Sequence, residues 1–443
     1  MPMDITTLAK QLQRHGELKQ EQGARGVAAV LNRARADLRR AVREVRALQD
    51  DESLRAHEPD DLRNILDLRP RGPRRLWQSF DRTAYESRVR GALLARMAGN
   101  VLGALVEGWS IQDMRQWAAR IGDAFPPTDY WSKAPQPERL HYGQSRSHAF
   151  TRLGLDGVPV DDDVAYTVLG LLIAEQFGSD FGTDQVAEAW LKYLPHACTA
   201  EHVALENLRA GVSPRKAAER DNPYCQWIGA DIRADPWGYV APGLPQRAAE
   251  MAYEDAFLSH RRNGIYGAMF FAASIAAAFA VDDPIEALRI GLTEIPRQCR
   301  LARDVRWALR KGPAIRDYRD ARAAVDRRFK GLHPVHTNNN ACLTVFGLFT
   351  GGTDVTRVLS QTVAMGLDND CTAATAGSIV GAVVGAKSVP RHWHRRFHNT
   401  VHSYLNGKRK FRIDDLVKRF MRQADTTVQE AARSETRAEH IRR

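Results

Sequence analysis

Long runs of small and apolar residues constrain the fold of this 443-residue chain more than any other feature. The clearest runs span residues 164–172, 264–279 and 373–385. None of them alternates polar with apolar residues, and two are too long for an ordinary strand, which is typical of helices buried on all sides. Alternation is rare elsewhere in the chain. The sequence therefore predicts an all-α bundle with several interior helices.

The run 264–279 approaches the length of a membrane span. It stays below the roughly 20 apolar residues that a spanning helix needs. Arg261-Arg262 and Asp282-Asp283 flank it closely, which suits a helix inside a protein core. We therefore expect no membrane partner.

Two acidic clusters stand directly before two of these runs. They are Asp161-Asp162-Asp163 and Asp368-Asn369-Asp370. Aspartates at a helix start can simply cap free backbone N–H groups. Acids at the ends of interior helices also lie near the core, however, and buried like charges require a counter-cation. Carboxylate oxygens are ligands that Mg²⁺ prefers, so the two clusters together could form one binuclear site.

A third segment, residues 88–107, has the pattern of a helix rich in small residues that ends at Glu107. Its glycines and alanines would allow close contact with another helix. Glu107 is either a surface acid after this helix or a third acidic group of the site.

These three segments, in this order, resemble the ADP-ribosylglycohydrolase family, which includes the enzyme that reactivates nitrogenase reductase. The family's small-residue helix ending in Glu corresponds to residues 99–107, its Thr-Asp-Asp-Thr motif to residues 161–164, and its Asp-Thr-Asp-Thr motif to residues 368–371. An Asn-Gly element that opens a helix corresponds to Asn263-Gly264. The resemblance runs from about Arg88 to about Val389 and implies a compact orthogonal helical bundle of the ADP-ribosylglycohydrolase type.

The resemblance also implies a reaction and a set of residues. The reaction is hydrolysis of the N- or O-glycosidic bond of ADP-ribose with Mg²⁺, two ions being expected and Mn²⁺ a possible substitute. Glu107 and Asp162 are the expected catalytic residues, and the expected substrate contacts are Asn100, Asn263, Gly264 and Tyr266. The expected metal ligands are Asp161, Asp162, Asp163, Asp368 and Asp370.

Departures from the family pattern leave other functions open. Asn100 replaces a common Asp, and Val164 and Cys371 replace threonines. A thiol is a poor Mg²⁺ ligand, so Cys371 brings the second ion into question. One alternative is a catalytically inert ADP-ribose-binding or scaffold protein. The other is a hydrolase of the same fold that acts on a small ribosyl metabolite. The expected partner is accordingly an ADP-ribosylated protein or an ADP-ribose-like small molecule.

The two ends of the chain lie outside this resemblance. We expect a helical N-terminal extension over residues 1–80, a catalytic domain over 81–425 and a basic C-terminal tail over 426–443. Residues 31–48 carry a short heptad seam, which predicts a helix that packs on the protein's own bundle or forms a homodimer. Residues 391–443 hold fourteen Lys or Arg and six Asp or Glu, but without a nucleic-acid-binding motif we expect no nucleic-acid partner.

The five cysteines are scattered without paired spacing, which is typical of a reducing compartment. The N-terminus lacks the apolar core of a secretory signal. Both features favour a cytoplasmic location.

Overall fold

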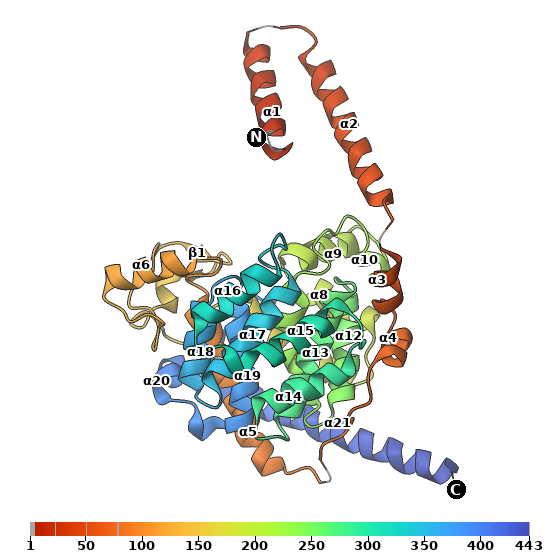
Figure 1. The fold of residues 1–443 in the computed structure, drawn as a ribbon, viewed down its shortest axis with the longest axis vertical. Coiled ribbons are helices and arrows are strands. Elements are labelled where there is room, and N and C mark those ends of the chain that lie inside the picture. The colour runs from red at the N-terminus through yellow and green to blue at the C-terminus, as the bar shows by residue number, and fades with distance from the viewer. Residues whose placement is uncertain (1–4, 23, 50, 78, 443) are drawn as a thin grey trace. The chain divides into compact units, whose positions relative to one another are not determined.

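A computed structural model describes residues 5–22, 24–49, 51–77 and 79–442, and its regular secondary structure is almost entirely helical (Figure 1). This confirms the predicted all-α fold. The only strands of the described residues form two small antiparallel pairs, β1 (Leu140–His141) with β2 (Ser145–Arg146) and β3 (Thr400–His402) with β4 (Lys410–Arg412).

The α-helices of the described residues follow in chain order. They are α1 (Ile5–Glu21), α2 (Val27–Ala47), α3 (Glu52–His57), α4 (Leu62–Leu68), α5 (Arg82–Gly103), α6 (Ile111–Ile121), α7 (Asp162–Phe177), α8 (Thr183–Tyr193), α9 (Thr199–Arg209), α10 (Pro214–Ala217) and α11 (Asp235–Val240). They continue with α12 (Pro245–Phe257), α13 (Asn263–Ala278), α14 (Pro284–Gly291), α15 (Arg300–Lys311), α16 (Tyr318–Arg328), α17 (Thr337–Gly351), α18 (Val355–Ala364), α19 (Asn369–Val384), α20 (Arg391–His394) and α21 (Ile413–Arg442).

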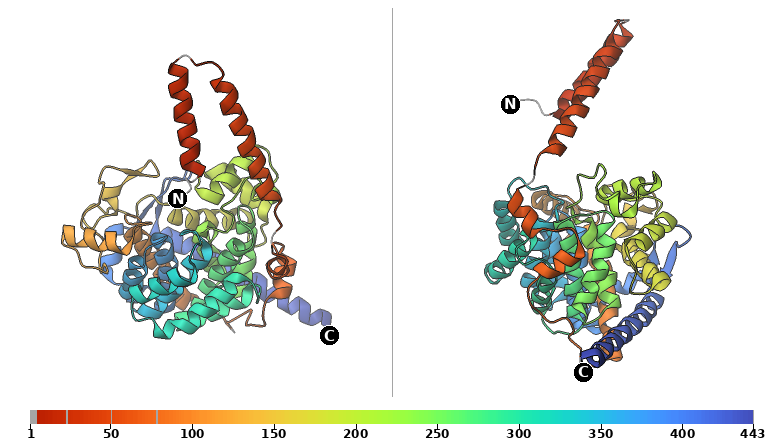
Figure 2. Two further views of the ribbon diagram at one scale, coloured as in Figure 1. Left: turned by 45° about the horizontal axis from the view of Figure 1, so that its top comes forward. Right: turned by 90° about the vertical axis from the view of Figure 1, so that its right-hand side faces the viewer.

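The contacts within the chain divide it into two units, residues 1–56 and 57–443. In the smaller unit α1 and α2 form a helical hairpin (Figure 2). Leu31 of α2 packs beside Gly16 of α1, where an added methyl group would lie 3.2 Å from the leucine side chain. Other members of the heptad seam, such as Leu38 and Val45, are exposed. Homodimerisation through this seam stays a prediction.

Interior helices organise the larger unit, as the apolar runs predicted. Every residue of α13 is buried, and so is every residue of α19 except Val384. In α7 the buried stretch runs from Asp163 to Ala174. A helix without a polar face can be satisfied only when other helices surround it, and this places these three helices in the core.

Close packing of α5 on α19 depends on glycines at the crossing. An added methyl group would lie 2.3 Å from Ala373 O at Gly99, and 2.4 Å from Gly381 O at Gly91. At Gly377, on the facing helix, it would lie 2.4 Å from Ala95 O. Only glycine allows backbones to approach this closely. These glycines therefore determine where along their lengths α5 and α19 cross.

Residues 57–80, assigned from the sequence to the N-terminal extension, belong to the larger unit. Arg69 and Arg74 form ion pairs with the fully buried carboxylate of Glu294. At the other end of the chain, α21 runs through the boundary that was expected at residue 426. Within the described residues, no helix is both long and apolar enough to cross a membrane.

Candidate metal centre

Three chain segments bring their acidic residues to one place in the core. These are the turn after α5, the start of α7 and the start of α19. Gly103 ends α5 directly against Asp370, because an added methyl group there would lie 2.4 Å from Asp370 Cα. In the following turn, Gly108 N donates to Leu367 O at 2.9 Å, so Glu107 is held beside Asp368.

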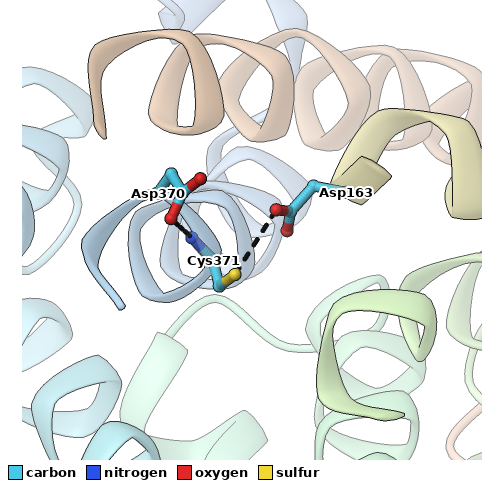
Figure 3. Close-up of side chains that lie close together, drawn as sticks. All are labelled: Asp163, Asp370 and Cys371. Carbon is cyan, nitrogen blue, oxygen red and sulfur yellow. Dashed lines mark hydrogen bonds between the residues drawn. The ribbon is translucent and has the colours of Figure 1, made fainter. Parts of the chain in front are cut away.

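The possible ligand atoms fall into three groups, and within each group the atoms lie within 4.8 Å of one another. One group joins Asp163 to Asp370 and Cys371, and another joins Glu107 to Asp368 and Asp370. The third is the cluster 161–163 itself. Residues more than two hundred positions apart in the sequence are therefore neighbours, and Asp370 belongs to two of the groups (Figure 3).

Asp161 has an extensive set of protein partners. Its Oδ1 accepts from Asp163 N at 3.0 Å, which caps α7, and from Asn100 Nδ2 at 2.7 Å. Its Oδ2 lies 2.7 Å from His141 Nε2. Both oxygens are thus engaged, and Asp161 is less available to a cation than its neighbours. Asp368, in contrast, makes no side-chain capping bond at the start of α19.

Cys371 faces the site as a hydrogen-bond donor. Its Sγ donates to Asp163 Oδ2 at 3.4 Å, while its backbone N donates to Asp370 Oδ1 at 3.0 Å (Figure 3). Burial, together with the nearby charge of Asp163, raises the pKa of the thiol well above its ordinary value. A protonated thiol is a weak metal ligand, and in this structure the Cys371 thiol is bonded to Asp163.

The electrostatics of the cluster are unfavourable for so many carboxylates. Desolvation and the charge of Asp161 raise the pKa of Asp162 to about 7. Burial raises the pKa values of Asp163 and Asp370 well above the ordinary range, and Asp161 and Glu107 respectively add to the effect. Removing these groups from water disfavours their charged forms unless a cation compensates.

Glu107 differs from the buried aspartates because it keeps contact with solvent. Desolvation by the surrounding protein, followed by the charges of Asp368 and Asp162, raises its pKa to about 8. The carboxyl group lines a cavity of about 240 Å³ whose walls include Trp109, Arg139, His141 and Phe150. This cavity offers space for a reactant beside the acidic cluster.

The residues fit a divalent cation that prefers oxygen ligands. Asp163 Oδ1 and Asp368 Oδ1 are both buried without a hydrogen-bond partner in the described structure. A buried carboxylate oxygen without a hydrogen bond is costly, and a bound cation would offset that cost. The donor set is carboxylate oxygen throughout once the thiol is set aside, which suits hard divalent cations as a class.

Arg96 supplies the internal positive charge of the site. The side chain is 1% exposed and its Nε donates to Thr167 Oγ1 at 2.7 Å. It pairs with Asp235 at 2.8 Å and lies 3.6 Å from Asp163 Oδ1. One guanidinium cannot neutralise the whole cluster, because Asp235 competes for it.

The other predicted substrate contacts lie at the start of α13. Asn263 Nδ2 donates to Glu58 Oε2 at 3.0 Å, and its Oδ1 accepts from Leu301 N at 2.9 Å. The Tyr266 hydroxyl donates to Pro59 O, and Gly264 lies against Cys225 O. These polar groups bind other parts of the protein, whereas Asn100 is the one predicted substrate contact that bonds directly to the acidic cluster.

Three residues of the site lie outside the acidic motifs. His141 comes from the β1–β2 hairpin, in a segment without a recognisable motif. Asn340 Oδ1 accepts from Asp368 N at 3.3 Å and links α17 to the start of α19, in a Thr-Asn-Asn-Asn segment that has the form of a helix cap. Arg96 carried a readable signal, since a charged residue within a small-residue helix is rarely buried without a specific partner.

Comparison with known proteins gives a family and a fold. The model of the family described as ADP-ribosylglycohydrolase matches residues 81–430. A solved structure of an ADP-ribosylglycohydrolase-related protein complex superposes with a TM-score of 0.54 at 18% sequence identity, and the match covers 78% of this chain and 99% of that one. At that identity the likeness shows a shared fold. No curated protein matches the sequence.

Proposed function

The chain belongs to the ADP-ribosylglycohydrolase family, and on that premise we propose that it is a Mg²⁺-dependent hydrolase of the glycosidic bond between ADP-ribose and a protein or another acceptor. The observation that carries the proposal is the convergence of Glu107, Asp163, Asp368 and Asp370 from three segments. Three of these four carboxylates are buried, and gathering them in the core is costly without a ligand.

The carboxylates divide into two sets that suit two ions. Asp163 and Asp370 would hold one, and Asp368 and Asp370 would hold the other, with Glu107 beside this second pair. When bound, the ions supply charge neutralisation and lower the pKa of a coordinated water. Because Asn100 and His141 already bond to Asp161, we assign Asp161 to positioning the aspartates that follow it rather than to binding an ion directly.

Glu107 is the proposed acid–base residue. Hydrolysis at an anomeric carbon needs a proton removed from water and a proton delivered to the leaving group. The Glu107 carboxyl group faces a cavity, keeps solvent contact and has a raised pKa, so it can hold or accept a proton near neutral pH. Asp162, with its raised pKa, is the second candidate for proton transfer.

Release of ADP-ribose from modified substrates tests the proposal. With Mg²⁺ or Mn²⁺ we expect release, and with excess chelator we expect none. Loss of a hydrogen-bond partner behind a metal ligand typically lowers activity by roughly 10–100-fold. Asp370→Asn should lower the rate by more than this, because Asp370 belongs to both ligand sets. Asp184→Asn, at an exposed acid of α8, is the matched control.

The substrate panel should include arginine- and serine-linked proteins and small ribosyl metabolites. Tight ADP-ribose binding by calorimetry with no turnover of any linkage would contradict the proposal and support an inert binding protein. Turnover of small metabolites alone would narrow the substrate class to them.

A further inference from the structure

A buried carboxylate from the start of the larger unit occupies a site made by the first residues of α13 and α15. The Glu58 side chain is fully buried. Its Oε1 accepts from Arg300 N at 2.8 Å, at the start of α15. Its Oε2 lies 2.8 Å from Arg262 Nη2 and accepts from Asn263 Nδ2 at 3.0 Å. The first N–H group of α15, two arginines and an asparagine amide thus surround one carboxylate.

The rest of this short segment is held in the same place. Asp60 Oδ1 accepts from Arg262 N at 2.6 Å, at the N-cap of α13. The carbonyl of Pro59 accepts from the Tyr266 hydroxyl. Residues 58–60 therefore cover the start of α13 with two acids and a carbonyl group.

The donors around Glu58 are those that bind phosphate groups in proteins. Free N–H groups at helix N-termini favour anions, and arginine binds phosphate oxygens with several N–H groups. Burial acts to raise the pKa of Glu58. The bonds from Arg300 and Asn263 outweigh burial, so the pKa of Glu58 is lowered. The site is built for an anion.

Positive charge continues from this site into a cavity of about 650 Å³. Arg300 lines both, and the cavity walls add Arg303, Arg328 and Lys330 against one acid, Asp304. Asn338, which is 3% exposed, also lines the cavity, and its Oδ1 has no hydrogen-bond partner in the described structure. The cavity can therefore take a ligand larger and more negative than a carboxylate.

We propose that residues 58–60 are an internal occupant of this anion site, and that a ligand carrying a diphosphate must displace Glu58 and Asp60 to bind there. The identity of the natural ligand, the diphosphate of an ADP-ribosyl substrate, rests on the proposed function. Displacement makes the segment an autoinhibitory contact, because part of the ligand's binding free energy is used to expel it. The segment directly follows the boundary between the two units of the chain.

The test measures binding of inorganic pyrophosphate to the full-length protein by calorimetry, with chelator present to keep divalent cations out. Removing the occupant's charge with Glu58→Gln or Asp60→Asn should tighten binding on the order of tenfold. Asp67→Asn, at an exposed acid of the neighbouring helix α4, should leave the affinity unchanged. Equal affinity in all four proteins would overturn the proposal.

Tyr266→Phe gives a test that changes no charge. It loosens the segment by removing the bond to Pro59, so it should also tighten pyrophosphate binding if Tyr266 anchors the occupant. Weaker binding would show instead that Tyr266 contacts the ligand and that the segment is a fixed part of the fold. This variant and Asp60→Asn keep the test decisive if Glu58→Gln does not fold.

Failure of this inference is distinct from failure of the proposed function. If the variants bind pyrophosphate more tightly but no ADP-ribosyl substrate is turned over, the proposed hydrolase function fails and the displacement of residues 58–60 stands. If the protein turns over an ADP-ribosyl substrate and none of the three variants changes turnover or pyrophosphate affinity, the hydrolase function stands and the displacement proposal fails.

Discussion

His141 illustrates how one residue outside the acidic motifs can control them. Its Nε2 contacts Asp161 Oδ2 at 2.7 Å, opposite the bond from Asn100, and the aspartate is held between them. His141→Ala should weaken Mg²⁺ or Mn²⁺ binding by roughly 10–100-fold, as loss of a supporting hydrogen bond does. Calorimetric titration measures this effect.

His141→Gln, which keeps a donor, should recover part of the loss, and His148→Ala, at an exposed histidine nearby, should cost nothing. Unchanged cation affinity in His141→Ala would show that Asp161 does not need this partner.

His336 gives the protein a pH dependence of stability. Its Nδ1 accepts from Asn338 N at 3.1 Å and caps α17, which requires an unprotonated ring nitrogen. Burial, followed by the charge of Arg300, lowers the pKa of His336 from 6.5 to about 4. The unfolded chain therefore binds the proton first, and the stabilising contribution is complete above pH 6.5 and is lost as the pH falls toward 4.

The loss should amount to as much as about 3 kcal/mol of unfolding free energy. Denaturant unfolding across this pH range measures it. His336→Asn retains a capping oxygen but cannot take up a proton, so it should flatten the pH dependence. The same change at the exposed His57 should not, and equal slopes in both variants would contradict the assignment.

At the scale of helices, the α5–α19 crossing positions the metal ligands. Gly103 allows α5 to end so close to α19 that an added methyl group would lie only 2.4 Å from Asp370 Cα. Gly103→Ala should lower the free energy of unfolding by about 1–3 kcal/mol through overpacking. It should also weaken cation binding, because α19 must shift and carry Asp370 with it.

Gly182→Ala is the matched control, since an added methyl group there would meet its nearest atom at an ordinary 3.4 Å. Chemical unfolding and cation titration of both variants give the two measurements. If Gly103→Ala lowers stability but leaves the cation affinity unchanged, the α5–α19 crossing does not position the cation site.

At the scale of the whole molecule, cation binding should stabilise the fold. The folded chain gathers carboxylates that repel one another, whereas the unfolded chain separates them, so a cation that binds only the folded state adds stability. Saturation at about 100 times the dissociation constant contributes about 2.7 kcal/mol. We expect Mg²⁺ or Mn²⁺ to raise the melting temperature by a few degrees and chelator to reverse it.

Asp370→Asn should reduce this shift, whereas Asp184→Asn should retain it. A melting temperature that neither cation changes would argue against a metal centre in the folded protein. Calorimetric scans of the full chain provide the comparison.

Much of this architecture is determined by local sequence pattern. Uniformly apolar runs such as residues 264–279 can be stable only as interior helices, whatever surrounds them. Because α7 and α19 are interior helices, the acids at their starts also lie in the core. Family motifs added the pairing of these acids with Glu107, and the structure places all three segments together.

What the local pattern could not determine is which distant groups complete each site. His141 reaches Asp161 from a hairpin with no motif, and Glu58 fills the start of α13 from two hundred residues away. The engagement of both Asp161 oxygens and the neutral, donating state of Cys371 likewise follow from packing. Hydrogen bonds and desolvation depend on the atoms that folding brings within a few ångströms, and spacing along the chain carries no record of them.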